Sequence, residues 1–149
     1  MAFEFTTIVS WAHLDANGHM ANTAYLDLCV DARFAYLASC GFTPEDFARL
    51  RIGPVVRRDE VDYFKELHLH QAVRVNYRMA GLSDDASHIC LRNEIFRPDG
   101  KLAACVNTSG GWFDLVARKL IAPPDKLADA LRRLERTDDF RALESSVNR

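Results

Sequence analysis

A long helical segment near the N-terminus most constrains how this chain can fold. Asn22 and Thr23 both suit an N-terminal cap, Gly41 suits a left-handed C-terminal residue, and no proline or glycine interrupts the stretch between them. The polar side chains recur at multiples of four and form one narrow stripe, whereas most of the helix circumference is apolar or aromatic. The stripe consists of Thr23, Asp27, Asp31 and Ser39. A helix with so little polar surface has to be enclosed by other elements.

Strand patterns occupy much of the remaining chain. Residues 3–11 alternate apolar and polar side chains, which is typical of a half-buried strand. Beyond an extra helical turn at 45–50, only strand patterns follow as far as residue 115, with turn sequences between them. These patterns lie at 55–64, 73–79, 87–96 and 101–115, and the turns at 81–85 and 98–100. This order predicts an α+β domain in which a curved antiparallel sheet wraps round one long central helix.

The C-terminal third carries three local signals. Two adjacent glycines at 110–111 predict a bulge or a close backbone approach inside the last long strand. Prolines at 123–124 end that strand, and leucines spaced over 127–134 form one apolar face of a short helix. We therefore expect the domain to span 1–135, followed by a charged tail at 136–149 that frays.

Composition excludes several classes of function. With 19 lysines and arginines against 21 acids the net charge is -2, so neither nucleic acid nor an anionic membrane is an expected partner. The first residues do not form a signal peptide and no apolar run is long enough to span a membrane, which predicts a cytoplasmic protein. The four cysteines show no paired spacing, which predicts reduced, buried thiols and no metal site.

One sheet and one helix leave an apolar face uncovered. We therefore expect a homodimer or a homotetramer, with the sheets joined edge to edge.

The loop between the first strand and the helix carries the most specific pattern. Its residues Asp15, Gly18, His19, Asn22 and Tyr25 fit the order Asp-x-x-Gly-(His)-x-x-Asn-x-x-Tyr. This resembles the signature of the 4-hydroxybenzoyl-CoA thioesterase-like branch of the hotdog superfamily. Further matching positions are Ala32, Arg33, Gly41, Val61, Asp62, Tyr63 and Pro123, so the resemblance covers roughly residues 5–124. It implies a hotdog fold and a cofactor-free enzyme that hydrolyses an acyl-CoA thioester to free acid and CoA.

The resemblance also assigns catalytic roles. In that family the loop aspartate is the nucleophile or general base, and the first N–H groups of the enclosed helix polarise the thioester carbonyl; Asp15 and the amide of Asn22 match these positions. Physical chemistry agrees, because unpaired N–H groups and the positive end of the helix dipole suit a developing oxyanion. Without the resemblance, Asp15 would be interpreted as a helix-entry residue that merely complements the dipole.

The other loop residues have open roles. His19 either orients Asp15, contacts substrate or simply fills the loop, and we include it among the catalytic candidates. Gly18 either lets the backbone turn closely past the acyl group or is an ordinary turn glycine, and Tyr25 is expected to line the substrate with it. His13 is expected to support the site indirectly at most.

Further positions outside the loop bear on substrate binding and metal binding. Arg118 and Lys119, near the end of the last strand, either bind the CoA phosphates or form a solvated strand end. Val30 matches the position of the acid that holds the phenol in hydroxybenzoyl members, so a hydroxybenzoyl substrate is not expected. His68 and His70 alternate in strand register, but no third ligand joins them.

Two other functions compete with thioester hydrolysis. The segment from Asp15 to His19 superficially resembles the Asp-x-Asn-Pro-x-His motif of hotdog enoyl-CoA hydratases, but it lacks the proline and its histidine is one residue too close. A non-catalytic acyl-CoA-binding protein is the second alternative, although a sensor would be expected to carry a further domain. The sequence leaves the acyl group and the carrier, CoA or acyl carrier protein, unspecified.

Overall fold

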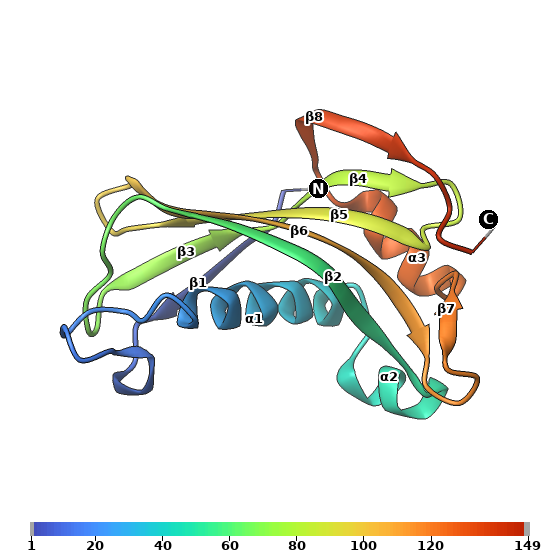
Figure 1. The fold of residues 1–149 in the computed structure, drawn as a ribbon, viewed down its shortest axis with the longest axis horizontal. Helices are drawn as coiled ribbons and strands as arrows, with labels where there is room; N and C mark the ends of the chain where they lie inside the picture. The colour runs from blue at the N-terminus through green and yellow to red at the C-terminus, as the bar shows by residue number, and fades with distance from the viewer. Residues whose placement is uncertain (1, 148–149) are drawn as a thin grey trace.

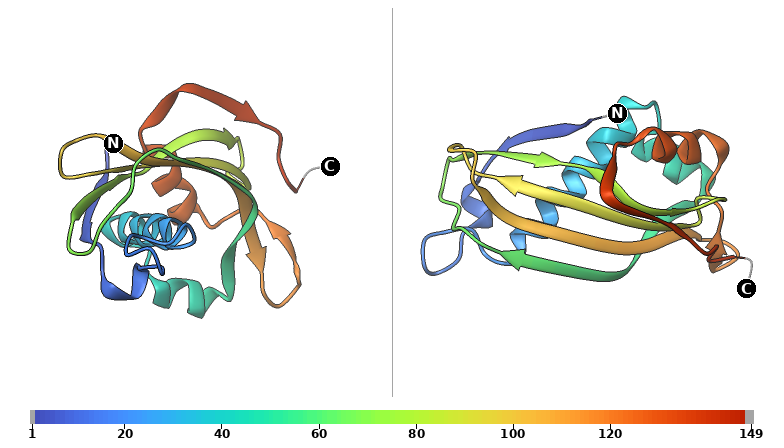
Figure 2. Two further views of the ribbon diagram at one scale, coloured as in Figure 1. Left: turned by 60° about the vertical axis from the view of Figure 1, so that its left-hand side comes forward. Right: turned by 90° about the horizontal axis from the view of Figure 1, so that it is seen from above.

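The computed structural model describes residues 2–147, and in it a strongly curved sheet covers one long helix (Figure 1). The strands are β1 (Glu4–Ile8), β2 (Ile52–Tyr63), β3 (Ala72–Asn76), β4 (Arg78–Ser83), β5 (His88–Phe96), β6 (Leu102–Asp114), β7 (Lys119–Ile121) and β8 (Arg136–Leu143). The helices are α1 (Ala24–Ser39), α2 (Pro44–Leu50), α3 (Asp125–Arg133) and a short 3-10 turn at Trp11–His13. The expected α+β architecture and the position of the long helix are thus confirmed, since α1 lies in the curve of the sheet (Figure 2).

The sheet is built around β5, which pairs with β3, β4 and β6. On one side β1 pairs with β3, and on the other β2 pairs with β6. β7 pairs with the end of β6. All of these pairs are antiparallel, whereas β8 runs parallel to β4. Within the described chain β2 has β6 as its only partner, so one side of this 12-residue strand is a free edge.

The apolar side of α1 fills the concave face of the sheet. Leu28, near the start of the helix, packs in one buried cluster with Val75 of β3, and Tyr36, near its end, packs in a second cluster with Trp112 of β6. The Tyr36 hydroxyl donates a hydrogen bond to the carbonyl of Ala130 over 2.5 Å, which ties α3 to α1. The predicted polar stripe is exposed, and Val30 beside it is 42% exposed. The helix therefore keeps one uncovered face in the single chain.

The glycine pair behaves as predicted. A Cβ atom on Gly110 would lie 2.1 Å from the carbonyl oxygen of Val55, so the backbones of β6 and β2 approach too closely for a side chain. The β2–β6 register shifts at the same place, between Val56 and Arg58.

The predicted frayed tail is wrong over most of its length. Residues 136–143 form β8, and the segment beyond it is held by Asp85, whose carboxylate accepts a hydrogen bond from the Ser145 hydroxyl over 2.5 Å. Arg92 of β5 also donates two hydrogen bonds to Asp139 of β8, at 3.0 and 2.8 Å. The local pattern of charged residues predicted a frayed tail because it does not reveal partners that lie far away in the sequence. Residues 148–149 of the expected tail lie outside the described residues.

Two smaller differences from the sequence-based expectation concern the strands. The strand expected at 73–79 is divided at Tyr77 into β3 and β4, and β4 continues through the first part of the turn expected at 81–85. The short strand β7 was not predicted.

All four cysteines are free thiols, and Cys29 is buried while Cys40, Cys90 and Cys105 are half-buried. None of the helices in the described part of the chain has the length and apolar character that a membrane span requires.

Candidate active site

The loop before α1 is a tight, hydrogen-bonded turn. The amide of Asp15 donates to the carbonyl of His19 over 3.0 Å, and the amide of Gly18 donates to the carbonyl of Asp15 over 3.1 Å. Gly18 has a φ of +82°, which explains the glycine, because side chains disfavour this region. A Cβ atom there would meet nothing within 4 Å. The glycine is therefore required by backbone conformation and not by close packing within the chain.

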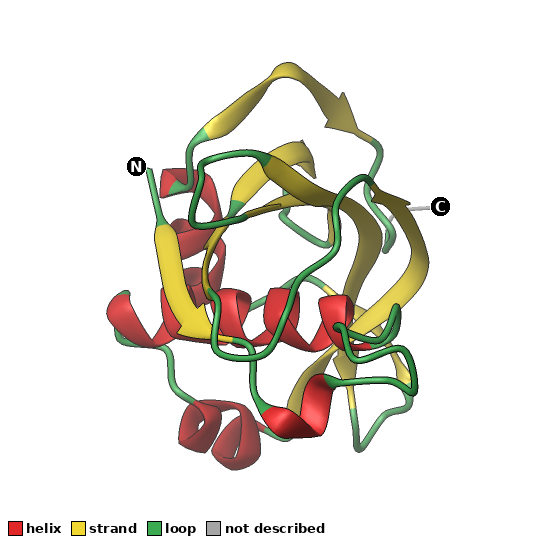
Figure 3. Ribbon diagram, turned by 90° about the vertical axis from the view of Figure 1, so that its left-hand side faces the viewer, coloured by secondary structure: helices red, strands yellow, loops and turns green. Residues whose placement is uncertain are grey.

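The second half of this loop, residues 19–20, pairs with the connection between β2 and β3. His19 and His68 form an antiparallel bridge, and the amide of Met20 donates to the carbonyl of Leu67 over 2.7 Å. Leu67 is fully buried and Met20 nearly so, so the pairing is anchored in the core. The two segments lie far apart in sequence but meet at the same end of the molecule (Figure 3).

Four of the predicted site residues line one open hollow. Its volume is about 350 Å³, and it contains Asp15, His19, Asn22 and Tyr25. The carbonyl of Asn22 accepts a hydrogen bond from the Tyr63 hydroxyl over 2.9 Å, which fixes the peptide at the entrance of α1. The N–H group of Asn22 has no main-chain acceptor among the described residues. The hollow therefore combines a carboxylate with the donor end of a 16-residue helix.

The ionisable groups of the hollow are arranged round His19. Its Nδ1 atom lies 4.0 Å from Oδ2 of Asp15, and its Nε2 atom lies 3.6 Å from Oε1 of Glu66. The other oxygen of Asp15 accepts a hydrogen bond from the amide of Asn17 over 2.8 Å, which orients the carboxylate. Sequence reasoning missed Glu66, because nothing in the spacing between residues 19 and 66 connects them.

Tyr25 is a protonated phenol at neutral pH. Burial raises the pKa of Tyr25, and the neighbouring Tyr63, Glu66 and Asp15 raise it further. Its hydroxyl donates to the carbonyl of Lys65 over 3.3 Å, and its ring packs edge-to-face on Tyr63 with the centroids 5.1 Å apart. Tyr25 and Tyr63 thus form a rigid wall of the hollow. Tyr63 was not identified as a site residue from the sequence.

The two basic residues expected at the CoA phosphates lie elsewhere in the single chain. Arg118 occupies the turn between β6 and β7, with a φ of +57° and its guanidinium 5.1 Å from the centre of the Phe113 ring. Lys119 begins β7 and pairs with Asp114. This turn lies at the opposite end of the molecule from the loop that holds Asp15 (Figure 1). Within a single chain, Arg118 and Lys119 therefore lie far from Asp15.

His13, His68 and His70 do not line the hollow. His13 lies close to Ser10, with its Nδ1 atom 3.1 Å from both the amide and the hydroxyl of that residue. Nε2 of His68 lies 3.6 Å from Oε2 of Glu66, and His70 takes a left-handed turn conformation with a φ of +66°. Across residues 2–147, no group of three histidines, cysteines or acids is arranged to hold a metal ion.

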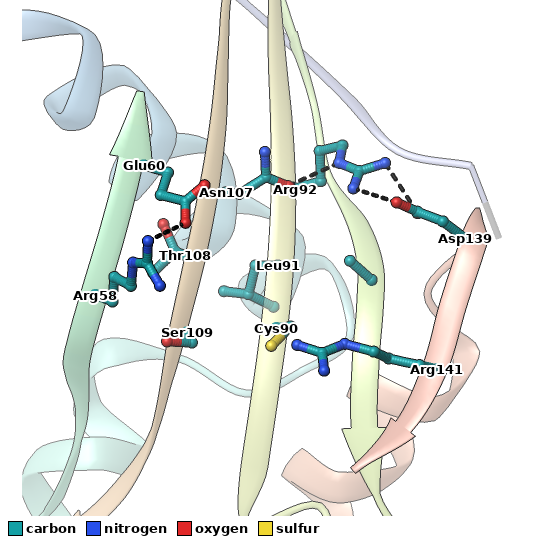
Figure 4. Close-up of a pocket in the computed structure, with 11 residues that line it drawn as sticks. Arg58, Glu60, Cys90, Leu91, Arg92, Asn107, Thr108, Ser109, Asp139 and Arg141 are labelled. Carbon is teal, nitrogen blue, oxygen red and sulfur yellow. Dashed lines mark hydrogen bonds and ion pairs between the residues drawn. The ribbon is translucent and has the colours of Figure 1, made fainter. Parts of the chain in front are cut away.

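A second groove lies on the side of the sheet turned away from α1 (Figure 4). Its volume is about 280 Å³, and Arg58, Arg92 and Arg141 reach into it from β2, β5 and β8. Arg92 is neutralised by Asp139, and Arg58 lies 2.6 Å from Glu60. The groove contains no helix N-terminus, so it lacks the arrangement of base and donors found beside Asp15.

A smaller, largely apolar cavity of about 120 Å³ lies between α1 and the β2–β6 pair. Its lining includes Val30 and Phe34 of α1, Val56 of β2 and Trp112 of β6. It shares no lining residue with the hollow at Asp15.

A family model and several solved structures resemble this chain. The model of a family described as the thioesterase-like superfamily matches residues 9–131. No curated protein matches the chain. A 1,4-dihydroxy-2-naphthoyl-CoA thioesterase from Synechocystis is similar, with a TM-score of 0.79 and 20% identity over 90% of this chain and 98% of the other.

Two Staphylococcus aureus structures resemble the chain to the same degree. A hypothetical protein in complex with CoA has a TM-score of 0.80 at 19% identity, over 92% of this chain and 87% of the other. A DHNA-CoA thioesterase has a TM-score of 0.80 at 21% identity, over 89% of each chain. These likenesses confirm the predicted hotdog fold.

Proposed function

The chain belongs to the thioesterase-like superfamily, and on that basis we propose that it hydrolyses an acyl-CoA thioester to free acid and CoA. One observation carries the proposal: Asp15 and the N-terminal end of α1 open into the same hollow. Acyl transfer needs a base or nucleophile beside donors that stabilise an oxyanion, and this hollow offers both. The structurally similar thioesterases act on CoA esters, which supports CoA as the carrier.

The proposed reaction uses the charges of the hollow directly. The thioester carbonyl lies against the N–H of Asn22, where the helix dipole stabilises the oxyanion that forms on attack. Asp15 either attacks the carbonyl carbon to form a mixed anhydride, which water then hydrolyses, or takes a proton from water as that water attacks. In both routes the C–S bond breaks, the sulfur leaves as the CoA thiolate, and the acid is released.

A hydratase is the second candidate, because His19 lies 4.0 Å from Asp15 and hotdog hydratases use such a pair. Water would then add across the double bond of a trans-2-enoyl-CoA, and no thiol would be released.

The site is proposed to be completed by a second copy of the chain. The sequence predicts sheets joined edge to edge, and the free edge of β2 would allow antiparallel pairing with its own copy about a two-fold axis. Full overlap of the two β2 strands would place Ile52 of one copy opposite Tyr63 of the other. Because Ile52 pairs with Asp114, and Asp114 with Lys119, this arrangement carries the basic turn of one copy toward the other copy's hollow. Arg118 and Lys119 would then hold CoA phosphates across the interface.

The decisive experiment is a panel of acyl-CoA esters, assayed by detecting the released thiol, with a trans-2-enoyl-CoA assayed in parallel by the loss of its conjugated absorbance. Hydrolysis of at least one ester with no hydration supports the thioesterase. Hydration without thiol release favours the second candidate. Tight binding of acyl-CoA with neither reaction identifies a non-catalytic binding protein.

A further inference from the structure

A carboxylate from a distant segment lies on the far side of the His19 ring. Glu66 belongs to the connection between β2 and β3, and its Oε1 atom lies 3.6 Å from Nε2 of His19. Nδ1 of the same ring lies 4.0 Å from Asp15. The imidazole thus lies between two carboxylates, one from each of the paired segments.

The backbone fixes this arrangement. The main chains of His19 and His68 form a bridge, and Leu67, the residue between Glu66 and His68, is fully buried. Glu66, next to the anchored Leu67, lines the hollow, and Nε2 of His68 lies 3.6 Å from its second oxygen. Glu66 therefore faces two imidazoles, one from each of the paired segments.

We propose that Glu66 is a positioning residue, which holds the His19 ring so that Nδ1 stays directed at Asp15; this role rests on the proposed thioesterase function. Glu66 faces one nitrogen of the ring and Asp15 faces the other, so the contact with Glu66 restricts rotation of the ring and keeps Nδ1 directed at Asp15. In metal sites, losing the outer partner that orients a ligating side chain typically costs about ten- to a hundredfold in affinity or activity, and we expect an effect of similar size here.

The test is Glu66→Gln, which keeps the shape of the side chain and removes its charge. If Glu66 acts through His19, kcat falls by about tenfold or more while KM for the acyl-CoA ester changes little. In a His19→Gln background the same substitution should cause no further loss, because the residue it supports is already absent. The side chain of Glu66 is 63% exposed, so folding should survive.

Glu60→Gln is the matched control. Glu60 is another exposed carboxylate on the nearby strand β2, but it pairs with Arg58 and does not line the hollow. Its replacement should leave kcat unchanged. A loss of activity that multiplies in the Glu66→Gln, His19→Gln double variant would overturn the proposal, because Glu66 would then act independently of His19.

A measurement without substrate separates this inference from the proposed function. The ring-nitrogen NMR resonances of His19 should move in Glu66→Gln and stay in place in Glu60→Gln. Unmoved His19 resonances would overturn the positioning role. If the wild-type chain hydrolyses no acyl-CoA ester, the thioesterase proposal fails, and the resonances alone then decide whether Glu66 holds His19.

Discussion

Replacing Asp15 by Asn separates a catalytic role from a structural one. The carboxylate accepts one hydrogen bond, from the amide of Asn17, and the side-chain oxygen of asparagine can accept the same bond. The side chain of Asp15 is 33% exposed, so the substitution opens no cavity. What is lost is the negative charge beside the positive end of α1.

The two roles predict effects of different size. A charge that complements a helix dipole contributes about 0.3 to 1 kcal/mol. For a chain of this length each kcal/mol lowers the melting temperature by about 2 to 4 °C, so we expect a fall of about 4 °C at most. A nucleophile or general base contributes about a hundredfold or more to kcat, which is about 2.7 kcal/mol of transition-state stabilisation. Asp15→Asn should therefore nearly abolish turnover in a folded protein.

Both quantities should be measured on the same purified variant, by thermal unfolding and by release of CoA thiol. A near-normal kcat with a slightly lowered melting temperature would refute the catalytic assignment and leave Asp15 as a helix-entry residue. Substrate binding, measured separately, should remain largely intact, because the proposed role of the charge is in the transition state.

Four further outcomes are expected. Light scattering should show a dimer or a larger assembly, and an active monomer at micromolar concentration would contradict the completed site. Replacing Arg118 and Lys119 together by Ala should raise KM more than it lowers kcat, as should added salt, and an unchanged KM would remove both residues from the site. Gly110→Ala should destabilise the fold by about 3 kcal/mol in denaturant unfolding, because the new Cβ atom would lie 2.1 Å from a carbonyl oxygen of β2. Gly53→Ala is the control and should be tolerated, because a Cβ atom there would have no neighbour within 4 Å. Burial raises the pKa of Asp85, but hydrogen bonds from three serines outweigh burial and hold the pKa well below its usual range. Asp85→Asn should therefore lower the free energy of unfolding at pH 7, and this loss should shrink as the pH falls below about 4. A loss that does not change with pH would contradict this.

Local sequence patterns were sufficient wherever a structure depends on near neighbours. The caps and the apolar circumference placed the long helix to within about two residues of Ala24–Ser39. The glycine pair at 110–111 identified a close backbone approach, because no other residue leaves room for one. The loop motif singled out Asp15 and Asn22, and both residues line the same hollow.

The sequence by itself therefore determined the order of the main elements, the family resemblance and the loop that carries Asp15. Tertiary structure alone decided what lies beside that loop. Glu66 reaches His19 because the buried Leu67 pairs the two segments, and β8 forms because β4 offers it an edge and Asp85 holds the segment that follows. Both arrangements depend on hydrogen bonds between residues more than 45 positions apart, and no local period or spacing encodes such pairs.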